Sequence, residues 1–183
     1  MESKIEIELS RLKIGLFFIG TLIFVILGIQ FAINPQEWLT SRSNSLEFVR
    51  IMGVITVVFF GTCGIFIIRK LFDNKIGLII DKRGITDNTN ATSIGLIEWE
   101  DISGIDKVEI ASSKILIIRT NKPDKYIGRA KNGISKFSMK ANHKLYGSPI
   151  SIISSSLKMK FNELEDLIKS EYKKRKSKTT YNK

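Results

Sequence analysis

The sequence predicts an α+β membrane protein, in which an N-terminal transmembrane helical hairpin precedes a β-sandwich or barrel with an inserted helix and a C-terminal capping helix. Three observations predict this class. Residues 14–33 contain no charge, and residues 51–68 form a second charge-free run. After residue 75, short apolar and β-branched runs alternate with polar turns. Residues 162–176 then have the apolar spacing of an amphipathic helix.

Each of the two apolar runs is long enough to cross most or all of a bilayer core of about 30 Å, because a helix rises about 1.5 Å per residue. The first run is longer than the apolar core of a signal peptide, and it ends at Asn34-Pro35 and not at a cleavage site of small residues. We therefore expect it to be retained in the protein. Apart from Cys63, neither run contains an ionisable side chain. The absence of charged residues from both runs argues against a transporter or pump. Their six glycines form no G-x-x-x-G pair, so packing within the hairpin and self-association both stay open.

Positive charge around the two runs predicts the topology. Lys4, Arg11 and Lys13 precede the first run, and five basic residues follow the second between residues 69 and 83. The connecting segment holds only Arg42 and Arg50, so both termini should be cytoplasmic. The expected parts are a cytoplasmic N-terminus (1–13), transmembrane helix 1 (14–33), an external loop (34–50), transmembrane helix 2 (51–68), a cytoplasmic domain (69–172) and a basic tail (173–183).

The cytoplasmic domain should consist of short strands and two helices. Strands are expected at residues 76–81, 84–87, 94–99, 106–110, 114–120, 126–129 and 148–154. The first helix covers residues 133–149, with one apolar stripe of the kind that a helix turns toward a core: Ile134, Phe137, Ala141 and Leu145. The second helix covers residues 162–176, with Asn162 as its N-cap and Glu165 completing a capping box.

This order of elements resembles the bacterial pleckstrin-homology-like membrane proteins with an N-terminal two-helix hairpin. The resemblance is carried by residues 77–85 (GLIIDKRGI), 95–102 (GLIEWEDI) and 147–150 (GSPI). It is greatest to a group of uncharacterised integral membrane proteins named after an enterobacterial locus. The resemblance implies a pleckstrin-homology-like domain in the bacterial inner (cytoplasmic) membrane and supplies no catalytic residue. The helix expected at residues 134–146 departs from a minimal fold of this type.

Basic residues give the best candidate for a binding surface. The net charge is +11, of which residues 71–183 contribute +9, from 22 Lys and Arg against 13 Asp and Glu. Lys136, Lys140 and Lys144 recur every four residues, with Arg129 and Lys131 upstream. This pattern suits anionic phospholipid headgroups, although an ordinary solvated helix face has it too. Nucleic acid is the weaker alternative, because only Tyr126 and Tyr146 lie near these charges for base stacking.

Catalytic chemistry has little support. His143 and Cys63 are the only residues of their types, so neither a metal site of histidines and cysteines nor a cofactor is expected. Glu98, Glu100 and Asp101 fit a solvated face, and no nucleotide-binding glycine motif occurs. We therefore expect a membrane-tethered, non-enzymatic binding module that engages anionic lipid, a protein partner or both. The alternatives are a structural or regulatory subunit that docks through the hairpin and, less favoured, an enzyme at the bilayer surface.

Overall fold

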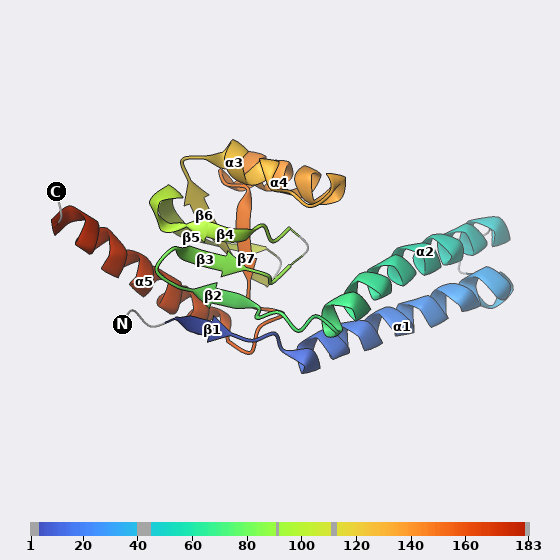
Figure 1. Cartoon of the computed structure of the whole chain (residues 1–183). Coiled ribbons are helices and arrows are strands. Elements are labelled where there is room, and N and C mark those ends of the chain that lie inside the picture. Colours follow the sequence, from blue (N-terminus) through green and yellow to red (C-terminus); the bar gives the residue numbers. More distant parts are fainter. Residues whose placement is uncertain (1–3, 40–44, 91, 111–112, 182–183) are drawn as a thin grey trace. The chain divides into compact units, whose positions relative to one another are not determined.

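The computed structural model describes residues 4–39, 45–90, 92–110 and 113–181, the last four of them by backbone alone (Figure 1). The chain forms two compact units. Arg11–Asn74 is called the hairpin unit, and Met1–Ser10 together with Lys75–Lys183 is called the strand unit. The short segment before the first helix therefore belongs with the second half of the chain.

The hairpin unit contains the two expected apolar helices. They are α1 (Arg11–Ile33) and α2 (Leu46–Leu71), with the short helix η1 (Pro35–Trp38) after α1. Both long helices are apolar and long enough to cross a membrane. Helix α2 begins earlier than expected, because the Ser45 side chain caps it by accepting a hydrogen bond of 3.3 Å from the Phe48 N–H. Large apolar side chains such as Phe17, Ile55 and Phe59 are exposed along both helices, which would be unfavourable in water.

The two long helices pack against each other through glycine. A Cβ atom placed on Gly53 would lie 2.7 Å from the Gly28 carbonyl oxygen and 2.6 Å from the Ala32 nitrogen. Next to this contact along the helices, the rings of Phe24 and Phe60 stack with centroids 4.3 Å apart. The glycines at positions 28 and 53 therefore allow the close approach of α1 and α2 within one chain.

The strand unit contains two antiparallel sheets. The first has the order β1 (Ile5–Ile7), β2 (Leu78–Ile80), β3 (Gly84–Asp87) and β4 (Gly95–Glu98), and the second has the order β5 (Ile102–Ile110), β6 (Ser113–Thr120) and β7 (Ile150–Ile153). Leu116, Ile117 and Ile118 are consecutive and buried. Because consecutive strand residues point to opposite faces, both faces of the second sheet are covered.

Strand β1 was not predicted, and it joins the N-terminal segment to the first sheet. Ile5 pairs with Ile80 and Ile7 pairs with Leu78 in antiparallel register. Leu9 forms an isolated bridge with Leu157. The boundaries expected from the sequence left this segment outside the folded domain, because three strand residues are too few to give a clear alternation.

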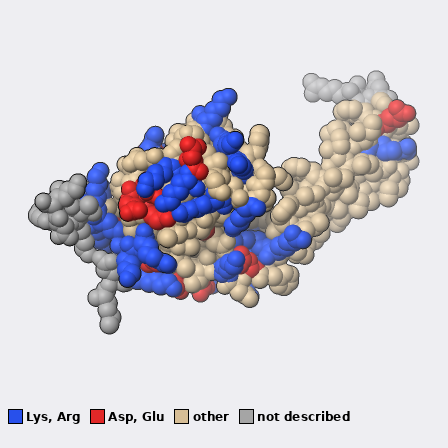
Figure 2. All heavy atoms as spheres, turned by 45° about the horizontal axis from the view of Figure 1, so that its top comes forward, with Lys and Arg blue, Asp and Glu red and all other residues tan. Residues whose placement is uncertain are grey.

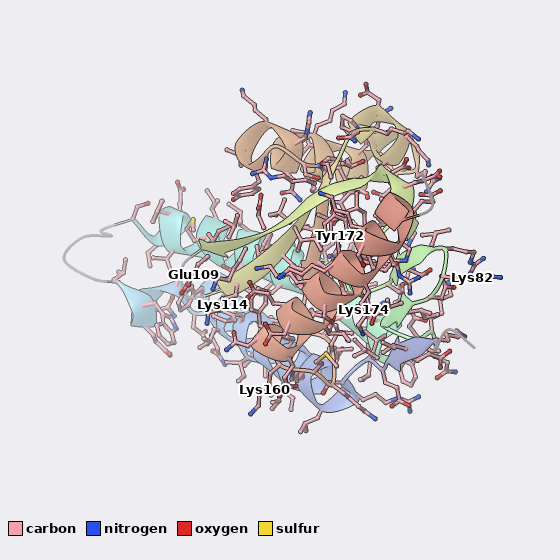
Figure 3. The ribbon with its side chains drawn as sticks, turned by 90° about the vertical axis from the view of Figure 1, so that its left-hand side faces the viewer. Lys82, Glu109, Lys114, Lys160, Tyr172 and Lys174 are labelled. Atoms are coloured by element: carbon pink, nitrogen blue, oxygen red, sulfur yellow. The ribbon has the colours of Figure 1, made fainter. Side chains whose placement is uncertain are left out.

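Helix α5 (Phe161–Tyr181) completes the core with its buried Leu164 and Ile168. The Tyr172 hydroxyl donates a hydrogen bond of 3.2 Å to the Ile102 carbonyl oxygen, which ties α5 to β5. Figure 3 shows Tyr172 on α5. The predicted N-cap at Asn162 was wrong. The helix starts one residue earlier, and the Glu163 carboxylate accepts a hydrogen bond from the Lys160 N–H, as the glutamate of a capping box does.

Two further expectations were wrong in their local structure. The segment expected as a strand at residues 126–129 lies mainly in a short helix, α3 (Pro123–Gly128), in which proline occupies the first helical position. The strand expected at residues 94–99 ends at Glu98, and a turn of 3₁₀-helix, η2 (Trp99–Asp101), leads into β5.

The glycine contact in the hairpin unit gives a test with two substitutions that should differ in their effect on stability. Gly53→Ala should destabilise the protein by about 1–3 kcal/mol, since the new methyl group meets backbone atoms of α1. Gly61→Ala on the same helix has open space around it and should be neutral or slightly stabilising. Thermal unfolding of the purified chain in mild detergent, followed by circular dichroism, measures both. Equal effects of the two substitutions would contradict the packing described.

Candidate functional site

The basic residues singled out in the sequence lie on or just before helix α4 (Gly133–Tyr146). The Asn132 side chain caps its start by accepting a hydrogen bond of 2.8 Å from the Ser135 N–H. Gly147 ends it in the left-handed region, with φ of 76°, where a residue without Cβ is favoured. The helix predicted here is thus confirmed, with sequence-local signals at both ends.

Helix α4 presents the opposite face from the one expected. Ser135 and Met139 are buried, and the Asn142 side chain donates a hydrogen bond of 3.3 Å to the Ser151 hydroxyl of β7. The large residues of the apolar stripe point outward, with exposed fractions of 75% for Ile134, 75% for Phe137 and 68% for Leu145. The expectation that this stripe faces the core was therefore wrong. The side of α4 that holds Met139 packs on the domain, and the side with the large residues of the apolar stripe is left uncovered.

The three lysines of α4, named here the lysine row, lie beside this stripe. Lys136, Lys140 and Lys144 are all exposed. Within the part of the chain that the structure describes, their side chains form no ion pair or hydrogen bond. Figure 2 shows lysine and arginine atoms over much of the strand unit, whereas most of the visible surface of the hairpin unit is uncharged. Lys131 is likewise exposed, in the turn before α4.

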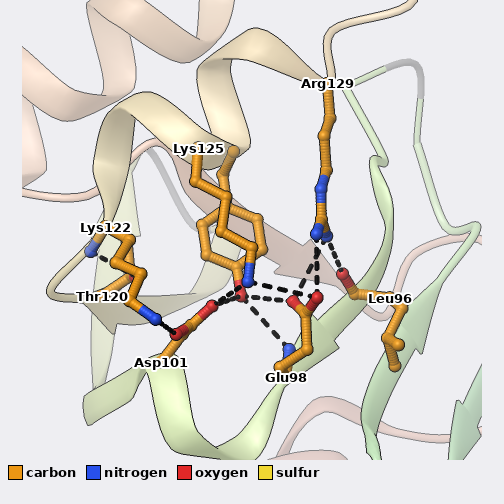
Figure 4. Close-up of polar contacts among 8 residues, drawn as sticks. Leu96, Glu98, Asp101, Thr120, Lys122, Lys125 and Arg129 are labelled. Atoms are coloured by element: carbon orange, nitrogen blue, oxygen red, sulfur yellow. Dashed lines mark hydrogen bonds and ion pairs between the residues drawn. The ribbon is translucent and has the colours of Figure 1, made fainter.

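Arg129, the fifth predicted contact residue, is engaged in a separate cluster (Figure 4). Its guanidinium donates to the Glu98 carboxylate at 2.8 Å and to the Leu96 carbonyl oxygen at 2.8 Å. On the other side of Tyr126, Lys122 forms an ion pair with Asp101 at 2.6 Å, and Lys125 contacts both carboxylates. Arg129 is therefore less available to an external anion than the lysine row.

The Tyr126 hydroxyl lies at the centre of this cluster. It is 2.7 Å from a Glu98 oxygen and 2.9 Å from an Asp101 oxygen, to which it can donate its single proton in turn, and it accepts a bond from the Glu98 N–H. Burial and the two carboxylates raise the pKa of the Tyr126 phenol far above its ordinary value. The phenol therefore stays protonated and acts as a donor throughout the physiological pH range.

The two carboxylates are held in their charged form. The hydrogen bond from Arg129 holds the pKa of Glu98 well below its usual range. Burial alone would raise the pKa of Asp101, but bonds from Lys122, Lys125 and Tyr126 outweigh it and lower this pKa to about 2. Each negative charge thus has a positive partner, and the arrangement clamps α3 onto β4 and η2. The solvated face expected at Glu98–Asp101 was wrong for Asp101, which is fully buried.

The remaining catalytic candidates are not brought together. His143 is exposed on α4, and its side chain makes no hydrogen bond or ion pair with other described residues. Cys63 lies in α2 of the hairpin unit. Among the described residues, no three side chains of His, Cys, Asp or Glu are grouped so that they could hold a metal ion.

Sequence reasoning located both the lysine row and the apolar stripe, but it turned the apolar stripe toward the core. The missed signal is the angle between the two rows: at about 100° per residue, the lysines flank the apolar stripe instead of lying opposite to it. A helix that packs its stripe on a core usually carries its charges on the far side. On α4, the side opposite to both the lysine row and the apolar stripe holds Ser135, Met139 and Asn142. These are the residues that face the domain.

Comparison with known proteins gives no match: no family model, no curated protein and no solved structure is similar to this chain. The resemblance to pleckstrin-homology-like membrane proteins therefore stays a prediction.

The cluster of Glu98, Asp101 and Tyr126 with its lysine and arginine partners is called the clamp, and its stability contribution should depend on pH. Because the pKa of Asp101 is about 2 in the folded protein and about 3.8 for an unperturbed aspartate in the unfolded chain, its charge stabilises the fold above about pH 4. This stabilisation is lost as the pH falls from about 4 to about 2, and asparagine has no such proton to bind. Asp101→Asn should therefore destabilise the protein at pH 7, and the difference from wild type should narrow by about 2 kcal/mol in acid.

Urea unfolding of the full chain in non-ionic detergent at several pH values measures this difference. Asp166→Asn, which changes an exposed carboxylate on α5, is the matched control and should show a small, flat difference. A constant gap between wild type and Asp101→Asn from pH 7 to pH 2 would refute the assigned role of Asp101.

Proposed function

We propose that this chain is a membrane-tethered, non-enzymatic binding module whose lysine row engages anionic phospholipid headgroups. The observation that carries the proposal is the position of Lys136, Lys140 and Lys144. They are exposed, aligned on one helix and without acidic partners among the described residues. They also belong to a chain with two helices that can cross a membrane.

Electrostatics favours an anionic surface over water as the environment of the lysine row. Like charges four residues apart destabilise a helix by a few tenths of a kcal/mol per pair. A nearby anionic leaflet offsets this, at about 1 kcal/mol per lysine. Because the strand unit is covalently joined to the candidate spans, its effective concentration at the bilayer is high, and a weak intrinsic affinity is sufficient.

The pairing of β1 with β2 supports the proposed orientation. β1 precedes α1 and β2 follows α2, yet Ile7 and Leu78 are neighbours in one sheet. If α1 and α2 cross the bilayer, both ends of the hairpin must therefore emerge on the same side. The basic residues at these ends favour the cytoplasmic side for both termini. The resemblance to bacterial pleckstrin-homology-like proteins implies the inner membrane, and we propose this location.

The architecture of the strand unit also supports the proposed pleckstrin-homology-like class. It has antiparallel sheets of four and three strands and a C-terminal helix whose apolar residues enter the core. A protein partner at another surface is compatible with this role.

The proposal is tested by energy transfer between the strand unit and the bilayer. The full chain, with Cys63→Ala and a donor dye at His143→Cys, is reconstituted in nanodiscs that contain a headgroup-labelled acceptor lipid. Transfer should be higher with phosphatidylglycerol than with phosphatidylcholine alone, and it should fall at high salt. Lys136→Gln, Lys140→Gln and Lys144→Gln together should abolish the response to anionic lipid.

The matched control removes the same number of charges elsewhere, with Lys82→Gln, Lys160→Gln and Lys173→Gln, all at exposed positions. It should keep most of the response to anionic lipid. If transfer is indifferent to lipid charge, or if both triple variants lose it equally, the lysine row is not the lipid contact. The alternative of a subunit that docks through its hairpin is then preferred.

A further inference from the structure

We infer that α4 is an interfacial helix, whose exposed apolar side chains enter the boundary between lipid headgroups and acyl chains while its lysines contact the headgroups. This inference rests on the proposed function and specifies its ligand as the bilayer surface itself, not a free phosphate or a detached headgroup. It differs from the role that the sequence suggests for these apolar residues, which was to fill the core.

The exposed half of α4 is divided lengthwise into two strips. At about 100° per residue, Phe137, Ile134 and Leu145 fall within an arc of about 80°, and the lysine row covers an adjoining arc of similar width. Helix α4 contains no Asp or Glu that could neutralise these lysines. The two strips together match the depth profile of an anionic leaflet, in which charge lies next to hydrocarbon.

The dimensions of α4 fit this location. Its 14 residues span about 21 Å, enough to lie along the membrane plane with the strip parallel to the surface. Interfacial helices bury their apolar face about 5–10 Å deep, which large side chains such as Phe137 can reach. The lysine stems are long enough to place the ammonium groups among the phosphates while their methylene groups lie in the apolar layer.

Other ligands of this surface would interact favourably with only one of the two strips. A soluble anion or a nucleic acid would use the lysine row and leave Ile134, Phe137 and Leu145 in water. A second copy of α4 could cover the apolar strip, but it would bring three more lysines nearby and no acidic residue of its own to balance them. An anionic bilayer satisfies both strips at once.

The exposed face of α4 has a fixed orientation, because contacts on the opposite face anchor the helix to the strand unit. The Asn142 side chain ties α4 to Ser151, and Met139 is fully buried under the helix. At the other end, the Arg129–Glu98 pair fixes the residue that follows α3, four positions before α4 begins. The apolar strip is therefore held outward by packing on the opposite side and is not exposed through local unfolding.

Spin labels at two positions of the same helix test insertion. In the full chain with Cys63→Ala, a nitroxide is placed at Phe137→Cys in the apolar strip, or at His143→Cys on the far flank of the lysine row. In nanodiscs with phosphatidylglycerol, the label at 137 should collide less with a water-soluble nickel chelate and more with oxygen than the label at 143. In detergent without lipid, the two labels should be similar.

A second variant measures the apolar contribution to binding. Ile134→Ser, Phe137→Ser and Leu145→Ser together should remove the energy transfer that wild type retains at high salt, because burial of one large apolar side chain shifts such an equilibrium by about tenfold. The same variant should keep some salt-sensitive transfer at low salt through its intact lysines. Circular dichroism of this variant should match wild type, since the three side chains are not in the core.

The outcomes separate this inference from the proposed function. If transfer depends on the lysines but the labels at 137 and 143 are equally accessible to nickel, the contact is electrostatic only and insertion is refuted. If transfer depends neither on the lysines nor on anionic lipid, both proposals fail. Dipolar broadening between labels at 137 of two chains, with no change in depth, would assign the strip to a second copy and overturn the inference.

Discussion

The pairing of β1 with β2 is the constraint on which the rest of the structure depends. It joins two segments that are about 70 residues apart in the chain, one before and one after the hairpin unit in the sequence. The Leu9–Leu157 bridge and the 2.8 Å hydrogen bond from the Ser10 N–H to the Ser156 carbonyl oxygen extend this junction to the segment before α5. β1 also covers an edge of β2 that would otherwise expose unpaired backbone groups. The strand unit is thus complete only when both ends of the hairpin meet.

The clamp around Tyr126 has a different role from the one that a dense group of charges usually suggests. Perturbed carboxylates often mark catalytic sites. Here each carboxylate is neutralised by a lysine or arginine, and the phenol between them is locked as a donor. The cluster holds α3 in place, and α3 leads directly into α4. Charge that is satisfied inside the cluster therefore supports a neighbouring surface on which charge is left unsatisfied.

The sequence predicted those parts of the structure that length and composition control. The two apolar helices follow from uninterrupted hydrophobic runs, and strands such as β3 and β6 follow from β-branched residues between turns. β1 and α3 were missed because three and six residues carry too little periodicity. The burial of Asp101 could not be predicted, since it depends on partners distant in sequence. The outward orientation of Phe137 had a sequence signal, because the lysines lie next to the apolar stripe on the helix and not opposite to it. The lysine row was predicted by its spacing alone, and the domain covers neither this row nor the apolar stripe but the face of α4 that holds Met139.

The separation of β1 from β2 also sets an order of events during synthesis. β1 leaves the ribosome first, yet its partner follows only after about 70 residues, which takes several seconds at about 5–20 residues per second. Packing of α1 against α2 brings the two strands close and replaces a long random loop search by a short one. A chain whose hairpin fails to form would leave the edge of β2 unpaired and the apolar side chains of both helical segments exposed at once. Formation of the hairpin is therefore a step on which completion of the strand unit depends, and a chain that fails at this step presents surfaces of the kind that chaperones recognise.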